Sequence, residues 1–320
     1  MSTTPAPRTT PAPRGDRWVH PLGTAERDGW QVVIDDTVDG WQHTGLLVTT
    51  LGPGDRKVVA TGGREAIVVP LAGAIRVRCT DVGGTPAVAE LAGRTSVFAG
   101  PTDVAYAPRG SELVLEADGE CRFAVCLAVV ANRTALSTLP FRHLGADEVP
   151  VELRGAGQAS REVHNFGVPG VLDAESIIAC EVITPAGNWS SYPPHKHDDY
   201  REGVETELEE IYYFEVGVEA GAPAGSETPD PVAYQRVYRA GDREIDVLAE
   251  VRSGDVVLVP YGWHGPATAP PGYDLYYLNV MAGPGPQRSW LICDDPAHAW
   301  VRQTWATQAI DPRLPLGGTR

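Results

Sequence analysis

The chain has 320 residues and a formal net charge of −16 at pH 7. This length favours two domains over one, and the charge argues against nucleic acid or an anionic membrane surface as a partner. The 35 glycines and 28 prolines indicate many turns between short strands. The 5 cysteines include no Cys-x-x-Cys pair, which predicts reduced thiols in a cytoplasmic protein.

The N-terminal residues 1–17 are rich in proline and repeat Thr-Thr-Pro-Ala-Pro-Arg. This composition predicts a disordered tail. The segment has no hydrophobic centre of the kind that a secretory signal needs. No apolar run in the chain is long enough to cross a bilayer.

Residues 18–145 are predicted to form a first domain of short strands. Val, Ile, Leu and aromatic runs alternate there with Gly and Pro turns, and no segment has helical periodicity. Strands are predicted, in chain order, at residues 31–35, 41–50, 57–60, 65–73, 74–79, 96–98, 103–107, 112–116 and 121–130. Many short strands of this kind favour a sandwich or jelly roll.

Residues 146–320 are predicted to form a second domain of the same type. Its tail after Cys293 predicts one short helix, capped by Asp294 or Asp295. Both domains contain an acid, an apolar run and a glycine, followed later by a Pro-x-Gly turn, which indicates a weak internal duplication. The strands are predicted at residues 161–166, 176–183, 211–214, 233–238, 244–251, 255–259 and 274–281.

Residues 190–217 carry the strongest chemical signal. His195 and His197 lie two positions apart, so in an extended strand both imidazoles point to the same face. A run of acids follows and ends at Glu209 and Glu210. Histidines with a carboxylate and open positions suit a divalent transition metal that takes part in chemistry. Further along, the turn ending at His264 delivers another imidazole to a strand end.

Together these segments resemble the two-part cupin motif, in which His-x-His and a glutamate lie near a histidine from the second part. In that pattern six residues separate the glutamate from a glycine, and Glu210 fits this spacing to Gly217, whereas Glu202 and Glu209 do not. Alternation along the strand also places Glu210 opposite Glu209. The longer gap between histidines and glutamate implies an inserted loop at residues 198–208. The resemblance implies four metal ligands: His195, His197, Glu210 and His264.

A closer resemblance covers residues 18–315. The segments S-Y-P-P-H-K-H-D, L-E-E-I-Y-Y-F, V-L-V-P-Y-G-W-H-G-P and D-P-A-H-A-W-V-R-Q-T-W resemble the 5-deoxy-glucuronate isomerase family of bacterial myo-inositol catabolism. A related family is the uronate ketol-isomerase of pectin breakdown. The resemblance implies an all-β bicupin, with two β-barrel or jelly-roll domains packed together and the metal in the C-terminal one. It also implies an aldose–ketose isomerase acting on a small sugar acid.

The chemistry of such an isomerase sets which residues are candidates. A divalent ion, with zinc or manganese favoured by the resemblance, polarises a carbonyl, and a nearby group moves a proton between adjacent carbons. Acids and phenols beside the motif are the candidate catalytic residues: Glu209, Tyr212, Tyr261 and Tyr277. A substrate carboxylate needs a cation, and the candidates are Arg288, Lys196 and Arg201.

Two other classes of function stay open at this point. A cupin dioxygenase would hold redox-active iron or copper at the same ligands. A sugar-binding cupin without catalysis would use the cavity alone. Exposed edge strands in two-cupin chains favour pairing across a homodimer.

Overall fold

The computed structural model describes residues 17–130, 139–222, 229–285 and 287–317. Within these ranges the chain is built from strands, with one short α-helix, α1 (Val301–Thr304), near the C-terminus. Short 3-10 turns occur at Ala146–Glu148, Gly157–Ala159 and Trp305–Thr307. The predicted all-β class with a short C-terminal helix is confirmed. Of the predicted disordered tail, residues 1–16 lie outside the described residues.

The N-terminal half forms a nine-stranded sheet. Its longest strand, β5 (Arg64–Thr80), pairs with β9 and β7 through its first part and with β6 and β8 through its second part. The sheet therefore folds back on itself as two layers. The other strands are β2 (Val32–Ile34), β3 (Thr44–Leu51), β4 (Arg56–Ala60), β6 (Pro86–Arg94), β7 (Val104–Ala107), β8 (Glu112–Glu116), β9 (Cys121–Val129) and β10 (Arg142–Leu144).

The C-terminal half forms two facing sheets. The seven-stranded sheet runs in the order β1 (Val19–His20), β19 (Val256–Val259), β16 (Glu209–Val218), β21 (Tyr273–Ala282), β13 (Ile178–Thr184), β12 (Arg161–Gly167) and β11 (Val151–Arg154). The six-stranded sheet contains β18 (Asp246–Val251), β17 (Ala233–Tyr238), β20 (Trp263–Thr268), β15 (His195–Lys196), β22 (Cys293–Asp294) and β14 (Trp189–Ser190).

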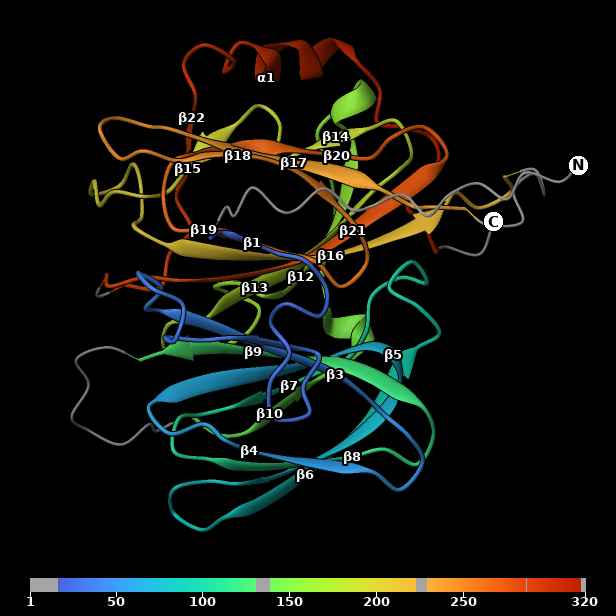
Figure 1. Ribbon diagram of the computed structural model, residues 1–320, viewed down its shortest axis with the longest axis vertical. Coiled ribbons are helices and arrows are strands. Elements are labelled where there is room, and N and C mark those ends of the chain that lie inside the picture. The colour runs from blue at the N-terminus through green and yellow to red at the C-terminus, as the bar shows by residue number, and fades with distance from the viewer. Residues whose placement is uncertain (1–16, 131–138, 223–228, 286, 318–320) are drawn as a thin grey trace, which may run out of the picture.

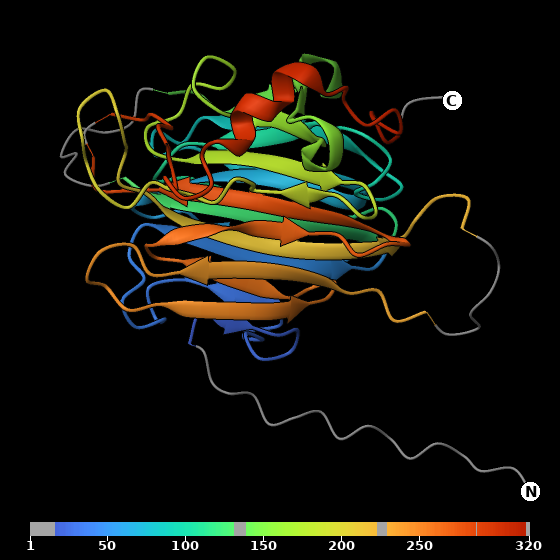
Figure 2. The ribbon, with the colours of Figure 1, turned by 90° about the horizontal axis from the view of Figure 1, so that it is seen from above.

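The sheets stack as four layers, with α1 lying over the outer face of the six-stranded sheet (Figure 1). The seven-stranded sheet lies between the six-stranded sheet and the N-terminal half (Figure 1). Seen from above, the sheets lie over one another with α1 in front of them (Figure 2). Burial follows from this stacking. Strand β16 is buried at its first eight positions, because protein covers both of its faces. Strand β18 alternates exposed and buried residues, because water covers one face.

Two buried glutamates join the halves by accepting backbone hydrogen bonds across the interface. Glu65 on β5 accepts them from the backbone N–H groups of residues 175, 176 and 177, at 2.8, 2.5 and 2.6 Å. Glu209 on β16 accepts them from the N–H groups of residues 42, 43 and 44, at 3.1, 2.6 and 2.6 Å. Hydrogen bonds to a buried carboxylate are among the stronger ones in proteins, so this reciprocal pair fixes the halves against each other.

Several elements differ from the sequence analysis. Residues 65–79 form one continuous strand rather than two. Residues 96–98 were predicted as a strand but lie in a turn, and β6 occupies residues 86–94, for which no strand was predicted. Strand β1 pairs with β19 and thus belongs to the sheet of the C-terminal half. Helix α1 begins at Val301 with Trp300 at its N-cap, rather than at Asp294 or Asp295. No described helix has the length and apolar character that a membrane span requires.

Candidate metal centre

Three histidines come together on two neighbouring strands of the six-stranded sheet. His195 on β15 lies directly opposite His264 on β20 in the antiparallel pairing, and His197 follows β15. The ring centroid of His264 lies 4.4 Å from that of His195 and 4.7 Å from that of His197. One nitrogen from each ring lies within 4.8 Å of the others. This spacing is what a single ion needs to contact all three.

Glu210 reaches the histidines from the facing sheet. It lies at the start of β16 and is buried. Its Oε2 lies 3.0 Å from His197 Nε2 and 3.2 Å from His264 Nε2. Strand alternation turns Glu210 toward this interior and Glu209 toward the N-terminal half. The structure thus brings together all four residues that the cupin resemblance implies.

The electrostatics of the four residues suit a bound cation. Burial, followed by the neighbouring His264 and His197, lowers the pKa of His195 well below its ordinary value. Burial would raise the pKa of Glu210, but the two imidazoles beside it lower this pKa to about 2. Among the described residues, nothing forms a hydrogen bond with the buried Nδ1 of His195, whereas Nε2 of His264 faces Glu210. Three imidazoles and one carboxylate that converge on one point form a ligand set for a divalent transition metal.

Backbone carbonyls set the tautomers of two of these histidines. Nδ1 of His197 lies 3.1 Å from the carbonyl oxygen of Leu208, and Nδ1 of His264 lies 3.3 Å from that of Gly262. A carbonyl oxygen only accepts, so Nδ1 of each ring donates. Nε2 is then left unprotonated, with a lone pair for a metal ion bound between the histidines and Glu210, as is usual for histidine ligands.

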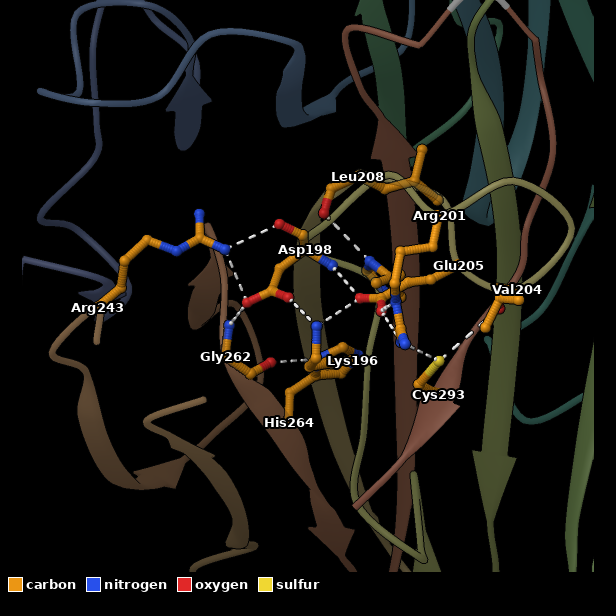
Figure 3. A network of polar contacts seen from close by, with 11 residues as sticks. Lys196, Asp198, Arg201, Val204, Glu205, Leu208, Arg243, Gly262, His264 and Cys293 are labelled. Atoms are coloured by element: carbon orange, nitrogen blue, oxygen red, sulfur yellow. Dashed lines mark hydrogen bonds and ion pairs between the residues drawn. The ribbon is translucent and has the colours of Figure 1, made fainter. Parts of the chain in front are cut away.

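The inserted loop at residues 198–208 is held beside the centre by ion pairs (Figure 3). Glu205 accepts hydrogen bonds from Lys196 Nζ at 2.7 Å and from Arg201 at 3.0 and 2.5 Å. Its carboxyl group is fully buried. Lys196 on β15 and Arg201 in the loop are therefore both paired with Glu205, and neither lines the cavity described below. The sequence made both residues candidates to bind a substrate carboxylate, but both lie away from the cavity.

Asp198 links this loop to the turn that carries His264 (Figure 3). Its Oδ2 accepts a hydrogen bond from the backbone N–H of Gly262 at 2.8 Å, and its Oδ1 accepts one from Lys196 at 2.5 Å. Arg243 pairs with the same carboxylate at 2.9 Å. Because Gly262 also accepts from His264, Asp198 fixes the turn that orients this imidazole.

We expect Asp198→Asn to weaken metal binding roughly 10–100-fold, the usual range for groups that orient a metal ligand. The amide loses the charge that Lys196 and Arg243 face, and the turn at Gly262 loosens. Titration of the metal-free protein with Zn²⁺ against a competing chelator measures the effect. Asp246→Asn is the matched control, because Asp246 pairs with Arg236 on the exposed surface. Equal affinity for the two variants would contradict this role for Asp198.

A cavity of about 350 Å³ adjoins His195 and Glu210. Tyr212 and Tyr277 line it, and both hydroxyls bond to Ser191 Oγ, at 3.1 and 3.2 Å. Sequence reasoning missed several residues of this wall, which are Arg154, Arg161, Ser191, Asn279, Trp290, Asp294 and Arg302. Alternation alone would have placed Arg161 and Val163 on one face, but nothing local identified that face as the cavity.

Three more candidates from the sequence lie elsewhere. Glu209 binds the backbone of the N-terminal half, as described above. Arg288 donates to the carbonyls of residues 167, 172 and 177, at 2.6, 2.5 and 2.6 Å, so loop carbonyls occupy its guanidinium. The hydroxyl of Tyr261 donates to the carbonyl of Glu244 at 3.2 Å. Of the candidates for catalysis and substrate binding, only Tyr212 and Tyr277 line the cavity.

Comparison with known proteins places the chain in a family. The model of the KduI/IolB family matches residues 18–301. The chain belongs to this family. Among its KduI/IolB relatives, a "5-deoxy-glucuronate isomerase" of Geobacillus kaustophilus is 38% identical over 293 residues, which cover 90% of this chain and 96% of the relative. A protein of the same name from Listeria monocytogenes is 40% identical over 240 residues, covering 74% of this chain and 79% of the relative.

Solved structures agree with this assignment. The crystal structure of an IolB-like protein from Salmonella typhimurium LT2 matches with a TM-score of 0.75 and 35% identity, covering 89% of this chain and 98% of that one. An oxalate decarboxylase from Lactobacillus farciminis matches with a TM-score of 0.57 and 14% identity, over 82% of each chain. The second likeness concerns the fold alone. The bicupin fold that the sequence predicted is confirmed.

Proposed function

We propose that this KduI/IolB protein is a metal-dependent isomerase that converts 5-deoxy-D-glucuronate to 5-dehydro-2-deoxy-D-gluconate in myo-inositol catabolism. The observation that carries the proposal is a centre of three histidines and Glu210 that opens on a cavity lined by arginines and phenols. The names of the relatives support the substrate. The arginines suit an acid, although the chain as a whole is strongly negative.

The reaction moves a hydrogen from the hydroxyl-bearing carbon to the neighbouring aldehyde carbon, while a proton passes between their oxygens. A divalent ion held by His195, His197, Glu210 and His264, with zinc or manganese as our proposal, would polarise the carbonyl. Burial raises the pKa of Tyr212 and of Tyr277 above the ordinary value. Both phenols therefore stay protonated near neutral pH and act as donors toward the substrate oxygens. Ser191 connects them, so a proton can pass from one hydroxyl to the other.

An isomerase assay tests the proposal directly. The purified protein, loaded with Zn²⁺ or Mn²⁺, is given 5-deoxy-D-glucuronate, and ketone formation is followed together with oxygen concentration. We expect turnover without oxygen uptake, loss of turnover on chelation, and recovery when the metal is returned. Turnover that requires oxygen would instead identify a dioxygenase. The 4-deoxy-5-hexosulose-uronate of pectin breakdown, assayed in parallel, is expected to react more slowly.

Three further properties belong to the same proposal. We place the enzyme in the cytoplasm, where its five thiols stay reduced. We propose a homodimer that pairs exposed edge strands, which sedimentation of the full chain tests. Its partner in function is the sugar acid, and neither nucleic acid nor membrane is expected to bind.

A further inference from the structure

We infer that Arg161 binds the carboxylate of the sugar acid, at the end of the cavity away from the metal centre. The inference rests on the proposed function, because it names the group that selects an acid over a neutral aldose at this site. It begins from the cations that line the cavity, Arg154, Arg161 and Arg302. They differ in whether a carboxylate of the protein already pairs with the guanidinium.

Two of these three arginines already have carboxylate partners. Arg154 donates to both oxygens of Glu152, at 2.9 and 2.7 Å. Arg302 likewise forms a two-point pair with Asp294. Among the described residues, Arg161 has no carboxylate partner, and its one hydrogen bond runs from Nη1 to the carbonyl oxygen of Ala159 at 2.9 Å. Its charge is therefore available to a ligand.

Arg161 is held in place although no carboxylate in the described part of the chain pairs with its charge. The residue is only 5% exposed. Its guanidinium lies 5.5 Å from the centre of the Trp305 ring, and a Cβ on Gly155 would fall 2.7 Å from its Nη1. Burial lowers the pKa of Arg161 to about 10, so the group stays charged at neutral pH. A buried charge without a partner is costly, and an anion entering the cavity would relieve that cost.

Arg161 lines the same cavity as His195 and Glu210 but lies on a different strand, away from the histidines. It begins β12, and three strand steps separate β12 from β16, which carries Glu210. Those steps span roughly 14 Å between backbones. The registers set Arg161 level with Val216 of β16 rather than with Glu210, so the diagonal separation of the backbones is larger. The side chain of Arg161 nevertheless lines the same cavity as His195 and Glu210. On the same inner face, Val163 of β12 lies opposite Val182 of β13, and Val182 lies opposite Tyr277 of β21. Arg161 and the metal centre therefore lie at opposite ends of one wall.

This arrangement predicts two-point binding of the substrate. The carbonyl end lies at the histidines, and the carboxylate end meets the planar fork of Arg161, which can bind both of its oxygens. Binding at the carboxylate is equal in the ground and transition states, because no bond changes there. Loss of Arg161 should therefore raise KM and leave kcat nearly unchanged.

The test uses Arg161→Gln and Arg161→Lys in the metal-loaded enzyme. The substrates are 5-deoxy-D-glucuronate and 5-deoxy-D-glucose, its neutral analogue with a hydroxymethyl group in place of the carboxylate. For Arg161→Gln we expect KM for the acid to rise about 30–100-fold, with kcat within about threefold and the neutral analogue unaffected. Arg161→Lys keeps the charge without the fork and should fall between. The preference for the acid over the neutral analogue should therefore decrease from wild type to Arg161→Lys and again to Arg161→Gln.

Arg142→Gln is the matched control, since Arg142 pairs with Glu148 on the surface of the N-terminal half and does not line the cavity. Its KM for the acid should rise less than about threefold. Metal content and unfolding midpoint are measured for every variant, so that a folding defect is recognised. If Arg161→Gln does not fold, Arg161→Lys decides, since wild-type KM in that variant would contradict a bidentate contact. An Arg161→Gln enzyme that keeps the wild-type preference for the acid overturns the inference.

A binding measurement separates this inference from the proposed function. D-Gluconate and D-sorbitol are titrated calorimetrically into wild type and Arg161→Gln. We expect gluconate to bind wild type alone, and sorbitol to bind neither. If gluconate binding depends on Arg161 but 5-deoxy-D-glucuronate is not converted, the inference stands and the proposed reaction fails. If the substrate is converted and both proteins bind gluconate equally, the reaction stands and the inference fails.

Discussion

Glu210→Gln is expected to lose its metal and to lower kcat by roughly 10³-fold or more. The Glu210 carboxylate is the only negative charge beside the three imidazoles among the described residues that form the centre. It lies within 3.2 Å of a nitrogen of both His197 and His264. Glutamine keeps the shape and removes the charge that offsets a divalent ion. Metal analysis of the purified protein and the isomerase assay measure both effects.

The control for this variant is Glu202→Gln, which changes an exposed acid of the nearby loop. We expect its metal content and kcat to equal those of the wild type. Full metal occupancy together with normal turnover in Glu210→Gln would remove Glu210 from the ligand set. The histidines would then have to act with water alone.

Glu209→Gln, one residue earlier, should destabilise the protein by about 2–4 kcal/mol. The Glu209 carboxylate is 7% exposed and accepts hydrogen bonds from three backbone N–H groups and from the hydroxyl of Thr44 at 3.0 Å. Glutamine cannot accept at both positions, so its amide group faces a backbone donor. The free energy of unfolding in urea measures the loss.

Glu65→Gln is the comparison variant, because it removes the corresponding contact that the N-terminal half makes with residues 175–177. Its destabilisation should be similar, because Glu65 also accepts from three backbone N–H groups. For Glu209→Gln, we expect kcat per bound metal to stay within about twofold of the wild type below the unfolding transition. A large fall in kcat with unchanged stability would return Glu209 to the reaction, as the sequence had suggested.

Glu209 and Glu210 show what the local sequence pattern can predict about a side chain and what it cannot. Alternation along β16 separates their faces, and the spacing to Gly217 selects Glu210 as the predicted ligand. The structure does turn the two side chains to opposite sides of the sheet. It could not assign Glu209, because its partners lie at residues 42–44, more than 160 residues away in the chain. From the sequence alone, Glu209 is therefore predicted as a catalytic base because it lies beside the metal motif. In the structure its carboxylate packs against the N-terminal half instead.

The sequence by itself determined the all-β class and most strands, and its resemblance to the cupin motif selected the four residues that the structure brings together. Strand periodicity and the spacing of His195 and His197 are local properties of the sequence. The turn before His264 is likewise predicted from its own residues, Pro260 and Gly262. Strand β6 was missed because residues 86–94 contain three alanines, a glycine and a proline, which β-propensity disfavours. Packing against β5 determines its conformation instead.

Only the tertiary structure decided which cations face the cavity. The cations predicted from the sequence are close to the motif segments in the chain, but the protein itself occupies them. Glu205 pairs with Lys196 and Arg201, and backbone carbonyls accept from Arg288. Arg161 has no motif around it, yet the pairing of β12 with β13 turns it toward the metal side of the sheet. Charge state and burial depend on partners brought together by non-local pairing. For that reason the anion site could be found only once the sheets were in place.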